Sequence, residues 1–250
     1  MNPSKLYRLV AMTLVAAGGA MLLASGPGNR FGLWPYGVAI GLLGSGALAA
    51  LAGGALALVG LAVPRLRAGQ AKALGTALVA ALALAYVPWQ FGRNARSVPP
   101  IHDISTDTVN PPPFVAVVPL RAGSPNAPGY DGPQVAELQR KGYPDLQPLV
   151  LRAPIQVAFN RALDAAQSMG WDIVASDSAS GRIEATATTL WFGFKDDIVI
   201  RVTPEGTSSR IDVRSKSRVG RSDVGANAKR IRAYLANLRG CAISTRIEAG

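Results

Sequence analysis

The chain has 250 residues and a formal net charge of +11, yet only 16% of its residues are charged and 49% are hydrophobic. Soluble domains carry roughly 25% charged residues, so this composition excludes a chain that is soluble throughout. The first 98 residues contain no Asp or Glu and eight of the 26 Lys and Arg residues. Removing these eight leaves 18 cations against 15 acids, so the basic balance reflects membrane-flanking charge rather than a nucleic-acid surface.

Residues 1–98 predict a membrane domain with three transmembrane helices, at about 6–25, 37–63 and 73–91. Each run approaches or exceeds the roughly 20 apolar residues that cross the hydrocarbon layer. The first run also fits a signal peptide, with a basic start and small residues near its end. The two apolar runs that follow favour a retained helix.

The second predicted span is crowded with small residues, including Gly37, Gly41, Ala50 and Gly54. Small residues four positions apart let helix backbones approach closely in lipid. Two interpretations stay open: packing within this chain's own bundle, or docking to a helix of another membrane protein.

The distribution of Lys and Arg predicts an orientation, because these residues favour the cytoplasmic side. One side of the predicted spans carries Lys5, Arg8, Arg65, Arg67 and Lys72. The other side carries Arg30, Arg93 and Arg96. We therefore expect a multi-pass protein of a bacterial inner membrane, with its N-terminus cytoplasmic and its C-terminal domain periplasmic.

Residues 99–153 are rich in Pro and Gly, which argues against long regular elements. A short strand at 114–120 and a short helix at 134–141 are expected. Apolar anchors such as Phe114 and Tyr143 predict an ordered wrap against the domain rather than a disordered linker.

Residues 154–240 predict the core of an α+β domain, and 241–250 a tail with the single cysteine, Cys241. A helix from Pro154 to Met169 precedes alternating strand patterns. A second helix, capped by Ser222 or Asp223, has an apolar stripe from Val224 to Leu238 and ends at Gly240. We expect an antiparallel sheet of about four to five strands flanked by two helices.

Three separated motifs carry a resemblance to a known family. They are Ile101-His-Asp-Ile-Ser-Thr-Asp107, Trp191-Phe-Gly-Phe-Lys-Asp-Asp197 and Val213-Arg-Ser-Lys-Ser-Arg-Val-Gly-Arg-Ser-Asp223. Together they resemble domain-of-unknown-function family 1499 over about residues 99–240, including its membrane-anchored bacterial members. The resemblance implies no activity and no site residues. The element order is also similar to helix-grip domains, at the level of fold only.

A row of cations is the most prominent polar feature of the predicted sheet. Arg214, Lys216 and Arg218 alternate along one strand and so share a face, which Arg201 of the neighbouring strand and Arg221 beyond it extend. This row is either a solvated face paired with Glu184, Asp197 and Asp212, or a surface for an anionic partner. Lipid headgroups, an envelope polymer and an acidic protein surface all have that chemistry.

Two further groups have alternative interpretations. Trp191, Phe192 and Phe194 belong either to the core or to a pocket between sheet and helices. His102 with Asp103 and Asp107 is either a metal or acid–base site or, as we favour, a set of turn and capping residues.

Asp196 and Asp197 are adjacent, so we expect them on opposite faces of a strand, at its exposed start. Their expected salt partner is Arg201 or Arg214.

The chain has no G-x-S-x-G, H-E-x-x-H or phosphate-loop motif, so we expect no catalytic residues, no metal and no cofactor. The sequence predicts a non-catalytic accessory or scaffold subunit of a membrane-associated assembly. Its expected partners are membrane lipids and another membrane protein, not nucleic acid. The alternative is a lipid or apolar-ligand binding module of the cell envelope.

Overall fold

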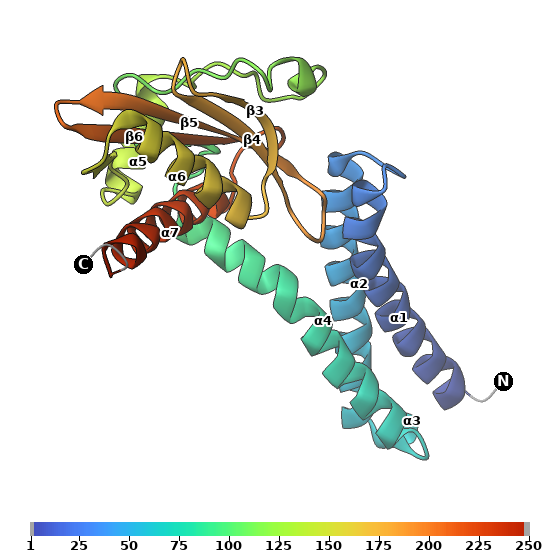
Figure 1. Cartoon of the computed structure of the whole chain (residues 1–250). Coiled ribbons are helices and arrows are strands. Elements are labelled where there is room, and N and C mark those ends of the chain that lie inside the picture. The colour runs from blue at the N-terminus through green and yellow to red at the C-terminus, as the bar shows by residue number, and fades with distance from the viewer. Residues whose placement is uncertain (1–2, 248–250) are drawn as a thin grey trace. The chain divides into compact units, whose positions relative to one another are not determined.

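The computed structural model describes residues 3–247, with side chains up to Gly240. The chain divides into two compact units (Figure 1). The first comprises Met1–Asn94 with Leu190–Gly193, and the second Ala95–Thr189 with Phe194–Gly250.

The first unit is helical. Its elements are α1 (Pro3–Arg30), α2 (Tyr36–Ala62), the short α3 (Pro64–Arg67) and most of α4 (Ala71–Ser97). The three long helices are long and apolar enough to cross a membrane, as the sequence predicts. Helices α1 and α4 extend beyond the predicted apolar runs at both ends, and Pro27 and Pro88 lie inside them. Prolines are tolerated in membrane helices because neighbouring groups satisfy the freed carbonyls.

Small residues bring α1 and α2 into close contact. A Cβ atom added at Gly18 of α1 would lie 2.6 Å from both the Ala50 nitrogen and the Gly46 oxygen of α2. A Cβ atom at Gly54 would lie 2.7 Å from that of Ala81 in α4. Ala50 and Gly54 therefore serve packing within this chain.

The second unit contains one six-stranded antiparallel sheet (Figure 1). The strands are β1 (Asp103–Ser105), β2 (Leu149–Leu151), β3 (Asp172–Asp177), β4 (Arg182–Thr188), β5 (Lys195–Glu205) and β6 (Ser208–Ser217). Their order is β1-β6-β5-β4-β3, and β2 also pairs with β6. The predicted α+β fold is confirmed. The sheet has more strands than expected, because the Pro/Gly-rich segment contributes β1 and β2.

Helices α6 (Ile155–Ser168) and α7 (Ala226–Ile247) enclose the core with one face of the sheet. Ile183, Ile198, Ile200, Ile211 and Val213 lie on this face, because side chains on alternate strand positions point the same way. Trp171 stacks on Tyr234 at 5.2 Å between ring centroids. Helix α7 begins later than expected, and Val224, with φ 54°, precedes it. It also continues beyond Gly240 to Ile247, into the predicted tail.

The segment before α6 is ordered. Besides β1 and β2 it contains the 3-10 turn η1 (Pro119–Arg121) and α5 (Pro133–Gly142), which corresponds to the predicted short helix. The strand predicted at 114–120 is wrong: this stretch forms turns and η1. Proline lacks the N–H that a strand ladder needs; Pro113 immediately precedes the stretch and Pro119 lies within it.

Candidate functional site

The face of the sheet opposite the helices is a buried layer of charged and polar side chains, here called the charged layer. Alternation along the strands and antiparallel register bring its members together, with Asp103 and Asp197 both opposite Lys216. Its buried members are Asp103, Arg121, Glu184, Thr186, Asp197, Asp212, Arg214 and Lys216, with Arg218 at the edge.

The segment from 106 to 131 covers the charged layer. Phe114 and Val117 pack on Val199, the one apolar residue among the layer's strand positions on β5. Arg121 of η1 is 3% exposed, and its NH1 lies 2.6 Å from the carboxylate of Asp197. The segment is therefore fixed by both apolar and ionic contacts.

Arg214 is the centre of the layer. It donates through Nε to Oδ1 and through NH2 to Oδ2 of Asp103, both at 2.8 Å. NH2 also donates to the carbonyl oxygen of Gly129 at 2.8 Å. Its guanidinium lies 4.6 Å from the ring centroid of Phe114 and 5.4 Å from that of Tyr130. These contacts compensate for the loss of solvent around a buried cation.

Lys216 is fully buried and equally well partnered. Its ammonium donates to Oδ1 of Asp131 and to the carbonyl of Gly129, both at 2.6 Å, and lies 3.2 Å from Asp103. His102 Nε2 approaches the other oxygen of Asp131 at 3.2 Å. Both Asp131 and Gly129 belong to the covering segment, so Lys216 links that segment to the sheet.

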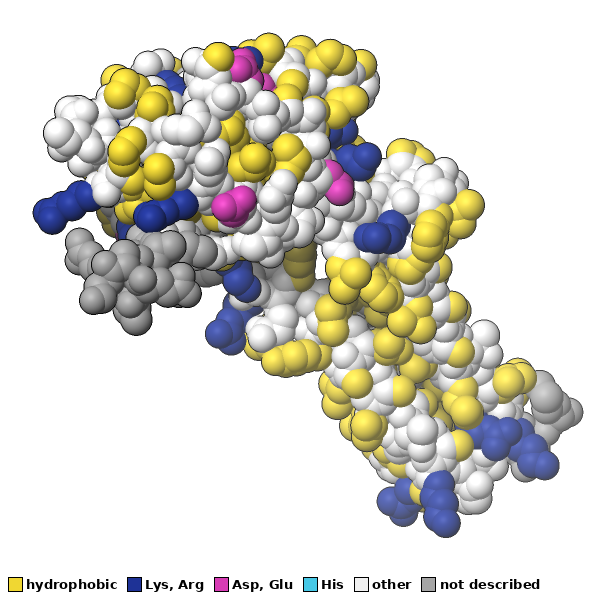
Figure 2. All heavy atoms as spheres, in the orientation of Figure 1, with side chains coloured by type: hydrophobic (Ala, Val, Ile, Leu, Met, Phe, Trp, Pro, Cys, Tyr) yellow, Lys and Arg dark blue, Asp and Glu magenta, His cyan; other side chains and the backbone are white. Residues whose placement is uncertain are grey.

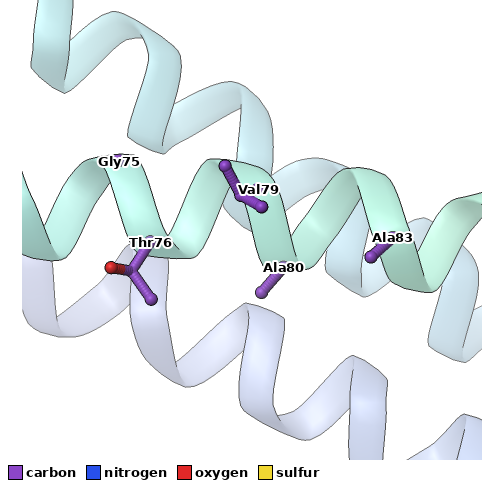
Figure 3. A pocket seen from close by; sticks show the side chains of 5 residues that line it. All are labelled: Gly75, Thr76, Val79, Ala80 and Ala83. Atoms are coloured by element: carbon purple, nitrogen blue, oxygen red, sulfur yellow. The ribbon is translucent and has the colours of Figure 1, made fainter.

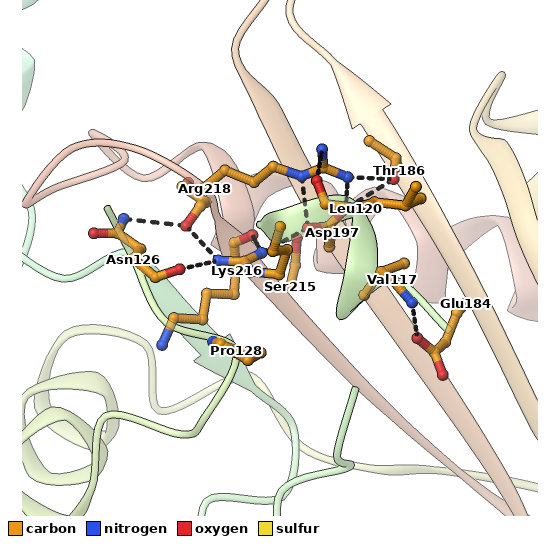
Figure 4. Close-up of polar contacts among 12 residues, drawn as sticks. Val117, Leu120, Asn126, Pro128, Glu184, Thr186, Asp197, Ser215, Lys216 and Arg218 are labelled. Carbon is orange, nitrogen blue, oxygen red and sulfur yellow. Dashed lines mark hydrogen bonds and ion pairs between the residues drawn. The ribbon is translucent and has the colours of Figure 1, made fainter. Parts of the chain in front are cut away.

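Two further carboxylates of the layer, Asp197 and Glu184, are shared between the sheet and the covering segment (Figure 4). Asp197 accepts from Arg121, from the Thr186 hydroxyl at 2.7 Å and from Arg218 at 2.8 and 2.9 Å. Glu184 accepts the backbone N–H groups of Val115 and Val117, each at 3.0 Å. Thus the layer neutralises its own charges and leaves few of them for an external ligand.

At the edge of the layer, Asp107 closes the turn that enters the covering segment. Its Oδ1 accepts from the N–H groups of Val109 and Asn110, and Oδ2 lies near Arg201 and Arg210. Burial opposes ionisation, but these hydrogen bonds and cations hold the pKa of Asp107 below its ordinary value. The predicted turn role of Asp107 agrees with this geometry.

A second polar cluster lies on the helix side of the sheet. Asp196 pairs with Arg230 of α7 at 2.6 Å, and Asn227 links Ser215 and Ser217 of β6 to that helix. Asp223 caps α7 by accepting from the N–H of Asn227. Burial raises the pKa of the Asp223 carboxyl above its ordinary value.

Several expectations about these residues are wrong. The cation row is not solvated, since Arg214 and Lys216 are 1% and 0% exposed. Asp196 and Asp197 do lie on opposite faces, but both are buried and pair with neither Arg201 nor Arg214. Asp103 is an ion-pair partner rather than a turn residue.

The remaining candidate residues have different environments. Arg201 pairs with Asp212 at 2.8 Å, whereas Arg221 is exposed. Trp191 is 47% exposed, and Phe192 and Phe194 are half-buried in the turn after β4, so none belongs to the core. Within the first unit, Asn29 donates to the carbonyl of Phe192 at 2.7 Å.

The sequence gives no sign that Arg121, Asp131, Asn227 and Arg230 belong to these clusters, because each reaches the sheet from another segment of the chain. The charge alternation on β5 and β6 was visible, but nothing local marks the segment that covers it. Among the described residues, no group of three or more His, Cys, Asp or Glu side chains is arranged to hold a metal ion.

The fold and the charged layer define an α+β domain in a chain with three candidate membrane spans. The chain belongs to the protein family of unknown function DUF1499, whose sequence model matches residues 103–238. The match begins at β1 and ends in α7, so it spans the charged layer and its covering segment.

No curated protein matches the chain. The crystal structure of TTHA0849 from Thermus thermophilus is similar at 11% identity and a TM-score of 0.26, over 39% of this chain and 95% of that one.

Proposed function

We propose that this protein is a non-catalytic accessory or scaffold subunit of a membrane-associated assembly, held there by a helix of a partner protein against α2. The observation that carries the proposal is a row of glycines on α2 that no described residue contacts. A Cβ atom added at Gly37, Gly41 or Gly44 would meet nothing within 4 Å. Positions 37, 41, 44 and 48 recur at helical spacing, and Leu48 is 70% exposed.

The buried side of the same helix shows what such glycines do when a neighbour is present. Gly46 and Gly53 contact α1, where added Cβ atoms would approach backbone atoms to 2.8 and 2.7 Å. Glycine lowers the stability of a helix by about 1 kcal/mol relative to alanine. In lipid it compensates by letting the backbones of two helices approach closely. The open row is the equivalent surface for a second helix.

The second unit supports a role in binding rather than chemistry. Its buried charges are engaged with one another, and they hold the covering segment to the sheet. A domain of this kind presents a fixed surface to a partner. In this proposal the α2 face docks in the membrane and the domain contacts the same assembly outside it, on the periplasmic side of a bacterial inner membrane.

A second function, binding of a lipid or another apolar ligand, is favoured by one specific observation. A hollow of about 480 Å³ lies along α4, lined by Gly75, Thr76, Val79, Ala80 and Ala83 (Figure 3). Its lining is apolar except for Thr76, and it is open rather than enclosed, so it suits an apolar chain that lies along the helix. Trp191, Phe192 and Phe194, the residues considered for a pocket, do not line it.

Purification of the full chain from its native membranes in mild detergent separates the two proposals. The variants Gly41→Leu and Gly75→Leu are matched, because each adds the same side chain where a Cβ atom meets nothing within 4 Å. We expect a stoichiometric partner with the wild type and with Gly75→Leu, and its loss with Gly41→Leu.

Recovery of a bare wild-type monomer would contradict the subunit proposal. A lipid bound by the wild type and lost only in Gly75→Leu, measured by mass spectrometry, would support the ligand-binding function instead.

A further inference from the structure

The cations of the helical unit collect at one of its ends. Lys5 and Arg8 lie in the first two turns of α1, Arg65 and Arg67 in α3, and Lys72 in the first turn of α4. All but Arg8 are exposed. Figure 2 shows dark blue side chains gathered at the end of the helices where α3 lies, with yellow side chains along the helices beyond.

Contacts among the helix ends keep these cations together. The Tyr7 hydroxyl donates to the carbonyl of Leu56 in α2 at 2.8 Å. A Cβ atom at Gly60, near the end of α2, would lie 2.9 Å from both the Tyr7 ring and Leu74 of α4. The start of α1, the end of α2 and the start of α4 therefore converge, and the cations beside them form one cluster.

No carboxylate of the helical region balances this cluster, since residues 1–98 contain no Asp or Glu. One of its members also has an unused donor: Arg8 Nε is buried and has no hydrogen-bond partner among the described residues. Gln70, in the loop between α3 and α4, is 9% exposed, and its Oε1 is likewise unpartnered. Buried polar atoms of this kind are normally satisfied, so the Arg8 donor indicates a ligand that supplies an acceptor, and the Gln70 acceptor indicates one that also supplies a donor such as a hydroxyl.

We propose that this cluster is a binding site for the headgroups of anionic phospholipids. The cations lie at the ends of helices that are long and apolar enough to cross a membrane. The ends of such helices lie at the depth of the lipid phosphate groups. A phosphodiester supplies the acceptors that Arg8 Nε lacks and the charge that the cluster lacks. Each Lys or Arg near an anionic membrane surface strengthens binding by about fivefold.

The site is distinct from the proposed partner surface. That surface is the glycine row of α2, which begins at Gly37, at the opposite end of the same helix from α3. Lipid binding at the basic end and partner docking along α2 can therefore succeed or fail independently.

The test uses the full chain in nanodiscs of equal parts phosphatidylglycerol and phosphatidylcholine, followed by release into mild detergent and native mass spectrometry. We expect the wild type to retain phosphatidylglycerol in preference to phosphatidylcholine. The double variant Arg65→Gln/Arg67→Gln should lose about thirtyfold of that preference, as two cations imply. Raising the ionic strength should weaken wild-type retention.

Two variants serve as controls. Arg93→Gln/Arg96→Gln removes the same charge from exposed positions at the other end of α4, and we expect the preference to be kept. Arg65→Lys/Arg67→Lys restores charge and should restore binding, which separates a lost site from a misfolded protein. Equal retention of the two lipids by the wild type, or equal losses in both glutamine variants, would overturn the proposal.

Discussion

Arg214 of β6 and Asp103 of β1 form a bidentate ion pair, with both N–O distances at 2.8 Å and neither residue more than 1% exposed. The pair joins a strand of the domain core to the segment that precedes it by 111 positions. It adds a side-chain contact to the backbone pairing of β1 with β6, at the point where the chain enters the covering segment.

Breaking this pair should destabilise the protein strongly. Removing one partner of a buried ion pair costs about 3–5 kcal/mol, because the other charge stays buried without compensation. We expect Arg214→Ala to lower thermal stability of the full chain in detergent accordingly. Arg232→Ala is the matched control, since its pair with Asp145 is 42% and 54% exposed and should contribute about 0–1 kcal/mol. Similar losses in the two variants would contradict the buried role of Arg214.

Glu184 anchors the covering segment through backbone N–H groups. We expect Glu184→Ala to accelerate hydrogen exchange at Val115 and Val117, because both donors lose their acceptor. The exposed pair of Glu137 with Lys141 supplies a control, and Glu137→Ala should leave exchange at 115–117 unchanged. If the N–H groups of Val115 and Val117 remain protected from exchange in Glu184→Ala, other contacts must hold the covering segment.

Asp107 should contribute an acid-dependent part of the stability. Its folded pKa is depressed, so the contribution is fully present above the unfolded value near 3.8 and is lost as pH falls through the folded pKa. The Asp107→Asn variant should be less stable than the wild type at neutral pH. On acidification below about pH 4 it should lose less of its free energy of unfolding than the wild type does. Parallel acid-unfolding curves, followed by tryptophan fluorescence, would contradict this role.

The contact of α1 with α2 depends on Gly18. A side chain there would overlap the Ala50 nitrogen and the Gly46 oxygen, both 2.6 Å from an added Cβ atom. We expect Gly18→Val to disrupt the helical unit and reduce thermal stability in detergent by several degrees or more. Gly44→Val changes the same residue type where the space is open and should have little effect on the isolated protein. Equal stability of the two variants would contradict the helix packing described above.

The core of the second unit could be predicted because its pattern is local. Ile198, Ile200 and Val202 alternate along a strand, and this alternation fixes the face that meets α6 and α7. The same alternation placed Arg214 and Lys216 on the opposite face correctly. Their burial could not be predicted, because it depends on residues 106–131, whose turns have no period.

The ends of α7 show a similar limit. Gly240 predicts a helix end, but glycine only lowers helix stability, and the residues after it continue the helix to Ile247. At the other end, Asp223 caps the helix as expected. The helix begins only at Ala226, because the positive φ of Val224 is not helical. In the helical unit, the small residues are visible in the sequence, but the sequence does not show which of them face another helix of the chain.

The proposal that α2 docks to another membrane protein is tested most directly by photocrosslinking in intact membranes. A photoreactive residue at Leu48 reports on the face of Gly41 and Gly44, and one at Leu82 of α4, 60% exposed, reports on another surface of the same unit. We predict one dominant protein adduct from position 48, identified by mass spectrometry, and lipid adducts from position 82. Lipid adducts alone from both positions would contradict the account.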